Sequence, residues 1–366
     1  MQISEILKEI EHFAPKTYQE SYDNSGVQLG DIGQKCTGVL STLDITEEVI
    51  REAIEKNCNL IVAHHPLIFS GLKNLTGKNY VERCVIKAIQ NNIVLYAAHT
   101  NFDNVFHGVN ARISDKLGLI NTTILSPMSH KLYKLYSYAP KELVVQIKEA
   151  LFAAGAGKIG NYSECSFETS GHGSFKPNEH AQPFIGQTGG KRECVDEVKF
   201  EVMVPEHLKY AIINTLKKAH PYEEVAYELI ALENSHQELG AGMIGELAKE
   251  MEVTAFLELI KKQFKVECIR HTKLVKTTVK RIAVCGGSGS FLLKEAKNKD
   301  ADVFITADFK YHQFFDADNK IVIADIGHFE SEQFTKEIFI EIITKKFSNF
   351  AVYLSQIKTN PINYYI

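Results

Sequence analysis

The sequence predicts an α/β fold whose core is split by an inserted α+β domain. Near each end of the chain, short and almost continuously apolar segments alternate with segments of helical periodicity. Such apolar segments are typical of parallel strands that are covered by helices on both faces. Between these two regions, the strand-like segments instead alternate apolar and polar residues. We therefore expect mainly parallel sheets in the core and a smaller two-layer domain inserted into it.

Length and composition indicate the general class of protein. The 366 residues are enough for two or three domains, and 45% hydrophobic with 23% charged residues is typical of a folded soluble chain. The net charge of −4 argues against a nucleic-acid partner. No apolar run reaches the roughly 18 residues that a membrane span needs. The N-terminal segment lacks the basic start and apolar centre of a signal peptide, so we expect a cytoplasmic protein.

Cysteine and histidine differ in what they indicate. The seven cysteines form no C-x-x-C pair, so neither a disulfide framework nor a thiolate zinc site is predicted. Several of the 14 histidines stand beside carboxylates at the ends of apolar runs. Histidine is therefore the residue type that points to a functional site.

The first part of the chain predicts an alternation of strands and helices. A first helix is followed by a loop that contains YDNSGVQLGD, and Asp44 is expected to cap the second helix. The predicted elements are a strand at 38–43, a helix to about 57, a strand at 60–63, a helix at 81–91 and a strand at 93–98. This order implies parallel pairing with right-handed crossovers.

The last part of the chain repeats this alternation. Strands are predicted at 281–285, 302–306 and 320–325, with a final helix from about Glu330. The loop at 286–290 is rich in glycine and lies between a strand and a helix. It predicts a tight turn, and the alternative is a backbone site for a phosphate group.

The middle of the chain predicts a different kind of domain. Alternating strands at 132–138 and 198–204 are each followed by a helix, and a further strand is predicted at 225–230. With a strand in the glycine-rich stretch, the order becomes the βαββαβ order of ferredoxin-like domains. We therefore predict a discontinuous core of residues 1–127 and 236–366, and an inserted domain of residues 128–235.

Ionisable side chains follow three of the predicted core strands. They are His64 and His65 after one strand, His99 and Asp103 after another, and His328 and Glu332 after a third. Because ligands bind beyond the carboxyl ends of parallel strands, we expect these groups to converge. The alternative is that each histidine is simply a surface or hydrogen-bonded residue.

These residue types and spacings favour a metal site. His64 and His65 are adjacent and expected to point in divergent directions, an expectation that Pro66 strengthens and that two metal ions would accommodate. His328 and Glu332 are four residues apart and share one face if they begin a helix. Imidazoles with carboxylates suit zinc, iron, manganese, cobalt or nickel, and Glu332 could bridge two ions.

Five motifs resemble, in this order, those of the NIF-three-like dinuclear-metal family, whose members are often labelled GTP cyclohydrolase 1 type 2 homologues. They are YDNSGVQLGD, IVAHHPLIF, AAHTNFD, ITADFKYHQ and DIGHFESEQF. The middle segment, with AGAGKIGNYSECSFETSGHGSF and AHPYEEVAYEL, resembles the PII- or CutA-like domain of the longer bacterial members. The resemblance covers nearly the whole chain.

The resemblance implies a specific site and assembly. The ligands of two divalent ions would be His64, His65, Asp103, His328 and Glu332, with Glu332 as the bridge. The assembly would be a toroidal homohexamer whose metal sites face an internal cavity. The family usually has a glycine at the position of Ala307, so the resemblance does not predict the backbone conformation near Asp308 and His312. Asp308, His312 and His99 are the candidates for proton transfer.

Two functions are compatible with these features. The first is a metal-dependent hydrolase that acts on a nucleotide or a phosphate-containing small molecule, and the family label implies ring opening of GTP. The alternative is a regulatory or metal-handling protein whose inserted domain senses a small molecule. In both cases the expected partners are further copies of the chain and a small molecule, and neither a membrane nor nucleic acid.

Overall fold

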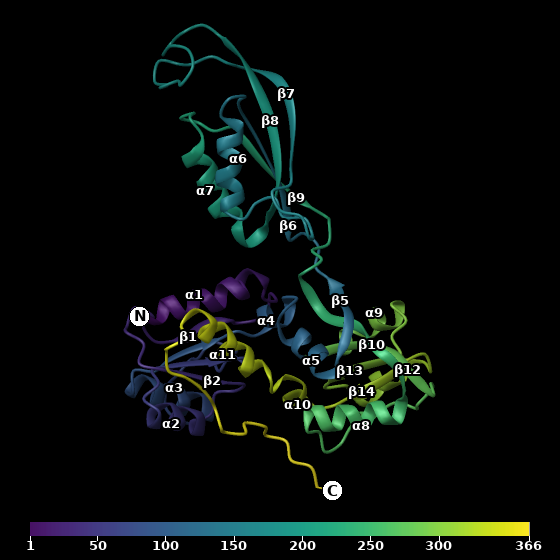
Figure 1. The fold of residues 1–366 in the computed structure, drawn as a ribbon. Helices are drawn as coiled ribbons and strands as arrows, with labels where there is room; N and C mark the ends of the chain where they lie inside the picture. The colour runs from purple at the N-terminus through teal and green to yellow at the C-terminus, as the bar shows by residue number, and fades with distance from the viewer. Residues whose placement is uncertain (366) are drawn as a thin grey trace. The chain divides into compact units, whose positions relative to one another are not determined.

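A computed structural model of the protein describes residues 1–365. These residues form two compact units (Figure 1). The first unit consists of residues 1–127 and the described residues from 238 onward, and the second consists of residues 128–237. Among residues 1–365, no helix is long and apolar enough to cross a membrane.

The first sheet of the first unit carries four parallel strands. Its order is β1-β4-β3-β2-β15, with β1 (Gly26–Leu29), β4 (Val94–Ala97), β3 (Leu60–Ala63), β2 (Val39–Thr42) and β15 (Val352–Leu354). Only β1 is antiparallel to its neighbour. The register pairs Thr42 with Ala63 and Ala63 with Ala97. The carboxyl ends of β2, β3 and β4 therefore lie at one edge of the sheet.

Helices cover both faces of this sheet. On one face α2 (Glu47–Glu55) and α3 (Tyr80–Gln90) bury an apolar cluster against the strands, and on the other face lie α1 (Ile3–Phe13) and α11 (Thr335–Lys346). The hydroxyl of Ser41 donates to a backbone carbonyl of α11 over 2.6 Å. Coverage of both faces explains why β3 and β4 are almost continuously apolar, as the sequence predicted.

The second sheet of the first unit is mixed. Its order is β11-β14-β13-β12-β10-β5, with β11 (Arg270–His271), β14 (Val322–Asp325), β13 (Val303–Ala307), β12 (Thr278–Ser288), β10 (Gly240–Glu252) and β5 (Leu119–Pro127). Only β12, β13 and β14 are mutually parallel. The expectation of mainly parallel sheets is therefore wrong here, because β5 and β10 pair antiparallel beside β12.

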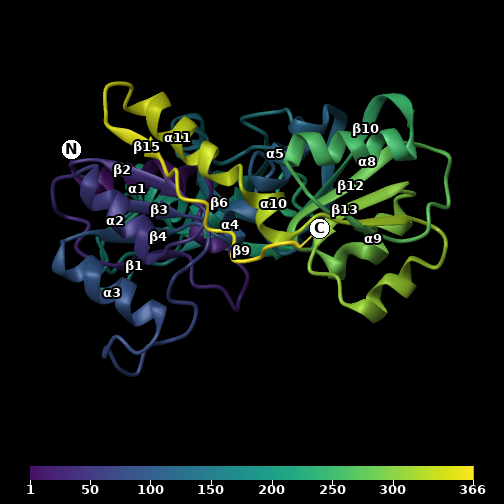
Figure 2. The same cartoon turned by 90° about the horizontal axis from the view of Figure 1, so that it is seen from below.

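Helices also cover the second sheet on both faces. One face carries α5 (Val109–Leu117) and α8 (Val253–Phe264), and the other carries η3 (Ser290–Leu292), α9 (Leu293–Asn298) and η4 (Tyr311–Ala317) (Figure 2). Short helices α4 (Thr100–Asn104) and α10 (His328–Glu332) follow β4 and β14, and η1 (Lys16–Tyr18) follows α1.

The second unit has two layers. Its elements are β6 (Leu132–Pro140), α6 (Val144–Ala153), β7 (Ser166–Phe175), β8 (Glu193–Pro205), η2 (Glu206–Leu208), α7 (Lys209–Ala219) and β9 (Tyr227–Leu232). The sheet order is β7-β8-β6-β9, and every pair is antiparallel. Leu135, Phe200 and Val202 pack against α6 and α7 in one apolar core.

Three local predictions need correction. The segment YDNSGVQLGD contains β1 instead of being only a loop, because Gly26 and Val27 pair with β4. Gly286 continues β12, which reaches Ser288. The cap of α2 is Thr46, whose hydroxyl accepts the backbone N–H of Val49, because the helix begins directly after it.

Candidate metal centre

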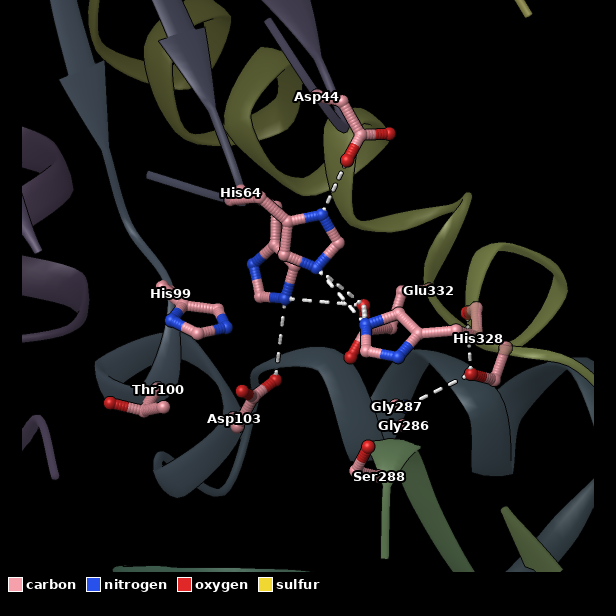
Figure 3. Close-up of polar contacts among 12 residues, drawn as sticks. Asp44, His64, His99, Thr100, Asp103, Gly286, Gly287, Ser288, His328 and Glu332 are labelled. Atoms are coloured by element: carbon pink, nitrogen blue, oxygen red, sulfur yellow. Dashed lines mark hydrogen bonds and ion pairs between the residues drawn. The ribbon is translucent and has the colours of Figure 1, made fainter. Parts of the chain in front are cut away.

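The candidate site lies where strands of the two sheets in the first unit end. Six side chains come together there, namely His64 and His65 after β3, His99 and Asp103 at the start of α4, and His328 and Glu332 in α10. Figure 3 shows the side chains of His64, Asp103, His328 and Glu332 turned toward one another. The structure thus brings together all five residues of the expected ligand set, together with His99.

The chain bends directly after β3, so both of its histidines face the same centre. The backbone N–H groups of His64 and His65 both donate to the carbonyl of Leu43, over 3.1 and 3.0 Å. Their ring centroids are 4.9 Å apart. The expectation of divergent side chains is therefore wrong, because the strand alternation does not continue through this bend.

One oxygen of Glu332 lies at the middle of the cluster. Its Oε2 is 3.0 Å from Nε2 of His65 and 3.1 Å from Nε2 of His328. The same oxygen is 3.7 Å from Nε2 of His64, which lies 3.6 Å from Oδ1 of Asp103. These short distances place several groups that accept a proton or cation around one point.

Each of the four histidines is held by its other ring nitrogen. The Nδ1 atoms of His64, His65, His99 and His328 lie 2.8, 2.7, 2.8 and 2.7 Å from the Ala98 carbonyl and from carboxylate oxygens of Asp44, Asp23 and Asp308. Since these partners can only accept, Nδ1 is the donor, and a neutral ring then presents the lone pair of Nε2 to the centre. This is the usual arrangement of histidines that bind metals.

The buried polar atoms of the cluster fit a cation. Within residues 1–365, Nε2 of His64 and Oδ1 of Asp103 are buried and make no hydrogen bond. The Nε2 atoms of His65 and His328 are 3.3 Å apart, a contact that is favourable only with a proton or cation between the two lone pairs. Two of the three groups whose ligand atoms lie within 4.8 Å of one another include Glu332. The residues present could therefore hold a metal ion.

The charges of the cluster also favour a bound cation. Burial alone would lower the pKa of His65, but its hydrogen bonds to Asp44 and Glu332 raise that pKa to about 10. Burial and the charge of Glu332 raise the pKa of Asp103 above its usual range. Against the effect of burial, the neighbouring histidines hold the pKa of Glu332 well below its usual range. The site as a whole favours added positive charge.

Two glycines at the end of β12 allow the close approach of Glu332. A Cβ at Gly287, whose φ is +61°, would collide with Oε1 of Glu332. The N–H groups of Gly286 and Gly287 donate to Asn110 and Ser331, each over 3.0 Å. These glycines therefore belong to the wall of the site, and the predicted tight turn is confined to Gly289, between β12 and η3.

The three candidates for proton transfer lie in different surroundings. His99 belongs to the cluster and is held by Asp23. Asp308 contacts His328 and Ser288, so it supports a ligand instead of facing the centre. His312 is exposed, and its ring contacts Tyr311 and Phe315. Of the three, His99 alone faces the centre.

Sequence reasoning missed two supporting carboxylates. Asp44 lies just beyond β2, as His64 follows β3, so the rule that selects strand ends could have identified it. Asp23 lies in the segment before β1, and only its hydrogen bonds to His99 and Thr100 show its role. Burial would raise the pKa of Asp23, but the hydrogen bonds from His99 and Thr100 lower it.

Comparisons with known proteins cover nearly the whole chain. The GTP cyclohydrolase 1 type 2 homolog of Bacillus subtilis is 39% identical over 98% of both chains, and that of Staphylococcus epidermidis is 38% identical over the full length of both. A crystal structure of a Bacillus cereus protein related to NIF3 is 36% identical, has a TM-score of 0.87, and the match covers 100% of this chain and 99% of the other.

A second solved structure and a family description agree with this. A crystal structure of a Staphylococcus aureus protein is 32% identical, with a TM-score of 0.79 and a match over 100% of this chain and 99% of the other. The description of the Duf34/NIF3 (NGG1p interacting factor 3) family matches residues 1–361. The resemblance of the five motifs is confirmed, and the chain belongs to the Duf34/NIF3 (NGG1p interacting factor 3) family.

Proposed function

We propose that the protein is a hydrolase that uses two divalent metal ions held by His64, His65, Asp103, His328 and Glu332. The observation that carries this proposal is the orientation of the histidines. Each ring donates through Nδ1 to an acceptor and directs Nε2 to a common centre. At this centre Nε2 of His64 is buried without a hydrogen bond among the described residues, and the Nε2 atoms of His65 and His328 converge on one oxygen of Glu332.

Glu332 is the proposed bridge between the two ions. It belongs to two three-residue groups, one with His65 and His328 and one with His64 and Asp103. The donor set of imidazoles and carboxylates suits zinc, iron, manganese, cobalt or nickel. Such ions supply Lewis acidity and lower the pKa of bound water, which makes hydrolysis feasible at neutral pH.

The remaining residues orient the ligands and move protons. Asp44 and Asp308 fix the rings of His65 and His328 through Nδ1. His99 is the proposed general acid or base, because its Nε2 faces the cluster while Asp23 holds its Nδ1 over 2.8 Å. The substrate is a nucleotide or another phosphate-containing small molecule, as the name of the relatives suggests.

The proposal extends to domains and assembly. The order βαββαβ and the antiparallel sheet of the second unit support an inserted ferredoxin-like domain of residues 128–235, of the PII or CutA kind. The family resemblance further implies a toroidal homohexamer. Light scattering coupled to size-exclusion chromatography tests the assembly, and a mass far from six chains would contradict it.

Turnover and bound metal, measured together, test the proposed function. The purified protein is analysed for metal by mass spectrometry and assayed with GTP, GMP and simple phosphate esters. We expect two ions per chain and turnover in the wild type, and loss of both in Glu332→Gln. The matched control is Glu330→Gln on the same short helix, where the carboxylate binds Asn360 over 2.8 Å. Metal binding without turnover of any substrate would contradict the hydrolase and support a metal-handling protein.

A further inference from the structure

The cavity beside the cluster has an unusual charge. Its volume is about 770 Å³, which is ample for a small molecule. Among the residues that the structure describes, its lining includes the four carboxylates of Glu20, Asp44, Asp103 and Glu332, and neither lysine nor arginine. Any positive charge that meets a ligand in this cavity therefore comes from the histidines and the metal ions.

This charge distribution disfavours a polyphosphate. Sites for nucleoside triphosphates combine a lysine or arginine with backbone N–H groups and a metal ion, because several phosphate charges must be balanced. Here Asp103 and Glu332 are proposed metal ligands and Asp44 binds His65, so the described wall beyond the metal centre offers no lysine or arginine to balance a second or third phosphate group. A single anionic group seated at the cluster can be balanced, whereas a chain of three cannot.

Exposed aromatic side chains line the same cavity. Tyr22 before β1, Phe69 after β3 and Phe291 in η3 are 66%, 51% and 66% exposed. The ring of Phe69 lies 6.2 Å from the ring of His99, centroid to centroid. Three large aromatic side chains in the lining of one cavity offer apolar surface to a planar ring, which they would cover and partly dehydrate.

The three amide side chains of the wall already have partners within the protein. Asn104 donates to the carbonyl of Tyr18, Asn110 donates to that of Asp103, and Asn360 donates to Glu330. These amides are therefore engaged within the protein instead of directed at a ligand. Recognition of a ligand would then depend mainly on contacts with its ring and on one polar group of the ligand at the cluster.

We propose that the substrate contains one planar, uncharged ring system and at most one anionic group. The ring lies against Tyr22, Phe69 and Phe291, and the anionic or polar group reaches the cluster of Glu332. This inference rests on the proposed function and narrows it, because a mononucleotide or a comparable aryl ester fits and GTP does not.

The test compares probes that differ only in ring or charge. The full chain is loaded with zinc, and calorimetry measures the affinities of inorganic phosphate, phenyl phosphate and inorganic triphosphate. Metal retained by the protein is measured after each titration. We expect phenyl phosphate to bind about tenfold more tightly than phosphate, the gain that one or two aromatic contacts provide. We expect triphosphate to bind no more tightly than phosphate.

Variants assign the ring preference to the cavity. Tyr22→Ala, Phe69→Ala and Phe291→Ala should each reduce the ratio of the phenyl phosphate affinity to the phosphate affinity, and Phe69→Tyr should keep it. The matched control is Tyr80→Ala, since Tyr80 is also exposed but belongs to α3 and lies outside the cavity lining.

Three results would overturn the inference. They are equal affinities for phosphate and phenyl phosphate, tighter binding of triphosphate with metal retained, and ratios that the three variants leave unchanged. The proposed function fails separately, through the absence of bound metal or of turnover. A metal-loaded protein that prefers phenyl phosphate but hydrolyses nothing would thus retain the inferred ligand class and lose only the hydrolase.

Discussion

His64 of the candidate centre and His220 of the second unit are both well buried, yet they use their ring nitrogens differently. His64 is fully buried and His220 is 6% exposed. Nε2 of His220 donates to the carbonyl of Tyr138 over 2.9 Å, and its Nδ1 accepts the N–H of Tyr222 over 3.1 Å. Nε2 of His64, in contrast, makes no hydrogen bond with any of the described residues.

This difference separates a histidine that is satisfied within the fold from a candidate metal ligand. His328 of the centre and His220 both occur in sequence motifs that combine histidine with nearby carboxylates. Burial lowers the pKa of His220, whereas the carboxylates beside His65 outweigh its burial and raise its pKa. What marks the site is therefore a second nitrogen without a protein partner among acidic groups, and not burial or sequence context.

The largest effect is expected from Gly287→Ala. Because the added methyl group would displace Glu332 from the centre, metal affinity should fall more than about 100-fold, beyond the loss typical of supporting residues. The matched control is Gly118→Ala, since φ is +67° there but no described atom lies within 4 Å of the added Cβ. Competition with a chelator measures the metal affinities. Equal losses of affinity in both variants would show that backbone strain alone causes the effect.

A smaller effect is expected from Asp44→Ala. Without its acceptor at Nδ1, the ring of His65 can rotate and change tautomer, so metal affinity should fall about 10- to 100-fold. Asp44→Asn should lose less, because its amide oxygen still accepts the same hydrogen bond. The same chelator competition measures both, and unchanged affinity in Asp44→Ala would show that His65 needs no such support.

His220→Phe should change stability instead of metal binding. The substitution leaves the carbonyl of Tyr138 and the N–H of Tyr222 without this partner, which costs about 1 kcal/mol of unfolding free energy. Denaturant unfolding followed by circular dichroism measures the loss, and metal content should equal that of the wild type. Loss of metal in this variant would break the distinction between the two kinds of histidine.

The smallest effect concerns pH. Burial outweighs the nearby charge of Glu197 and lowers the pKa of His220, so the folded state binds the proton less readily than the unfolded state, whose pKa is about 6.5. This contribution to stability is complete above about pH 6.5 and is lost as the pH falls below that value. The free energy of unfolding, measured from pH 8 to pH 5, should fall more in the wild type than in His220→Phe. Parallel profiles of stability against pH in the two proteins would contradict the assignment of this pH dependence to His220.

Parts of the fold and site were predictable because they follow from local patterns. The mostly apolar strands β2, β3 and β4 and the polar residues after them can be identified from the sequence. The pairing of β5 with β10 could not be, because the two strands are separated in sequence by the whole second unit. Likewise, the bend that turns His64 and His65 to one centre depends on the carbonyl of Leu43, which no local pattern indicates.

That same pairing of β5 and β10 bears on how a chain of this kind can gain or lose a domain. Pro127 and Gly240 are direct partners in the ladder, so the backbone leaves and re-enters the first unit at adjacent points. A two-residue Asn-Gly turn could join the strands there with a small cost in loop closure. The first unit can thus be treated as a scaffold with an insertion point between Pro127 and Gly240, where a different domain, a tag or a short turn can be placed without changing the walls of the candidate centre.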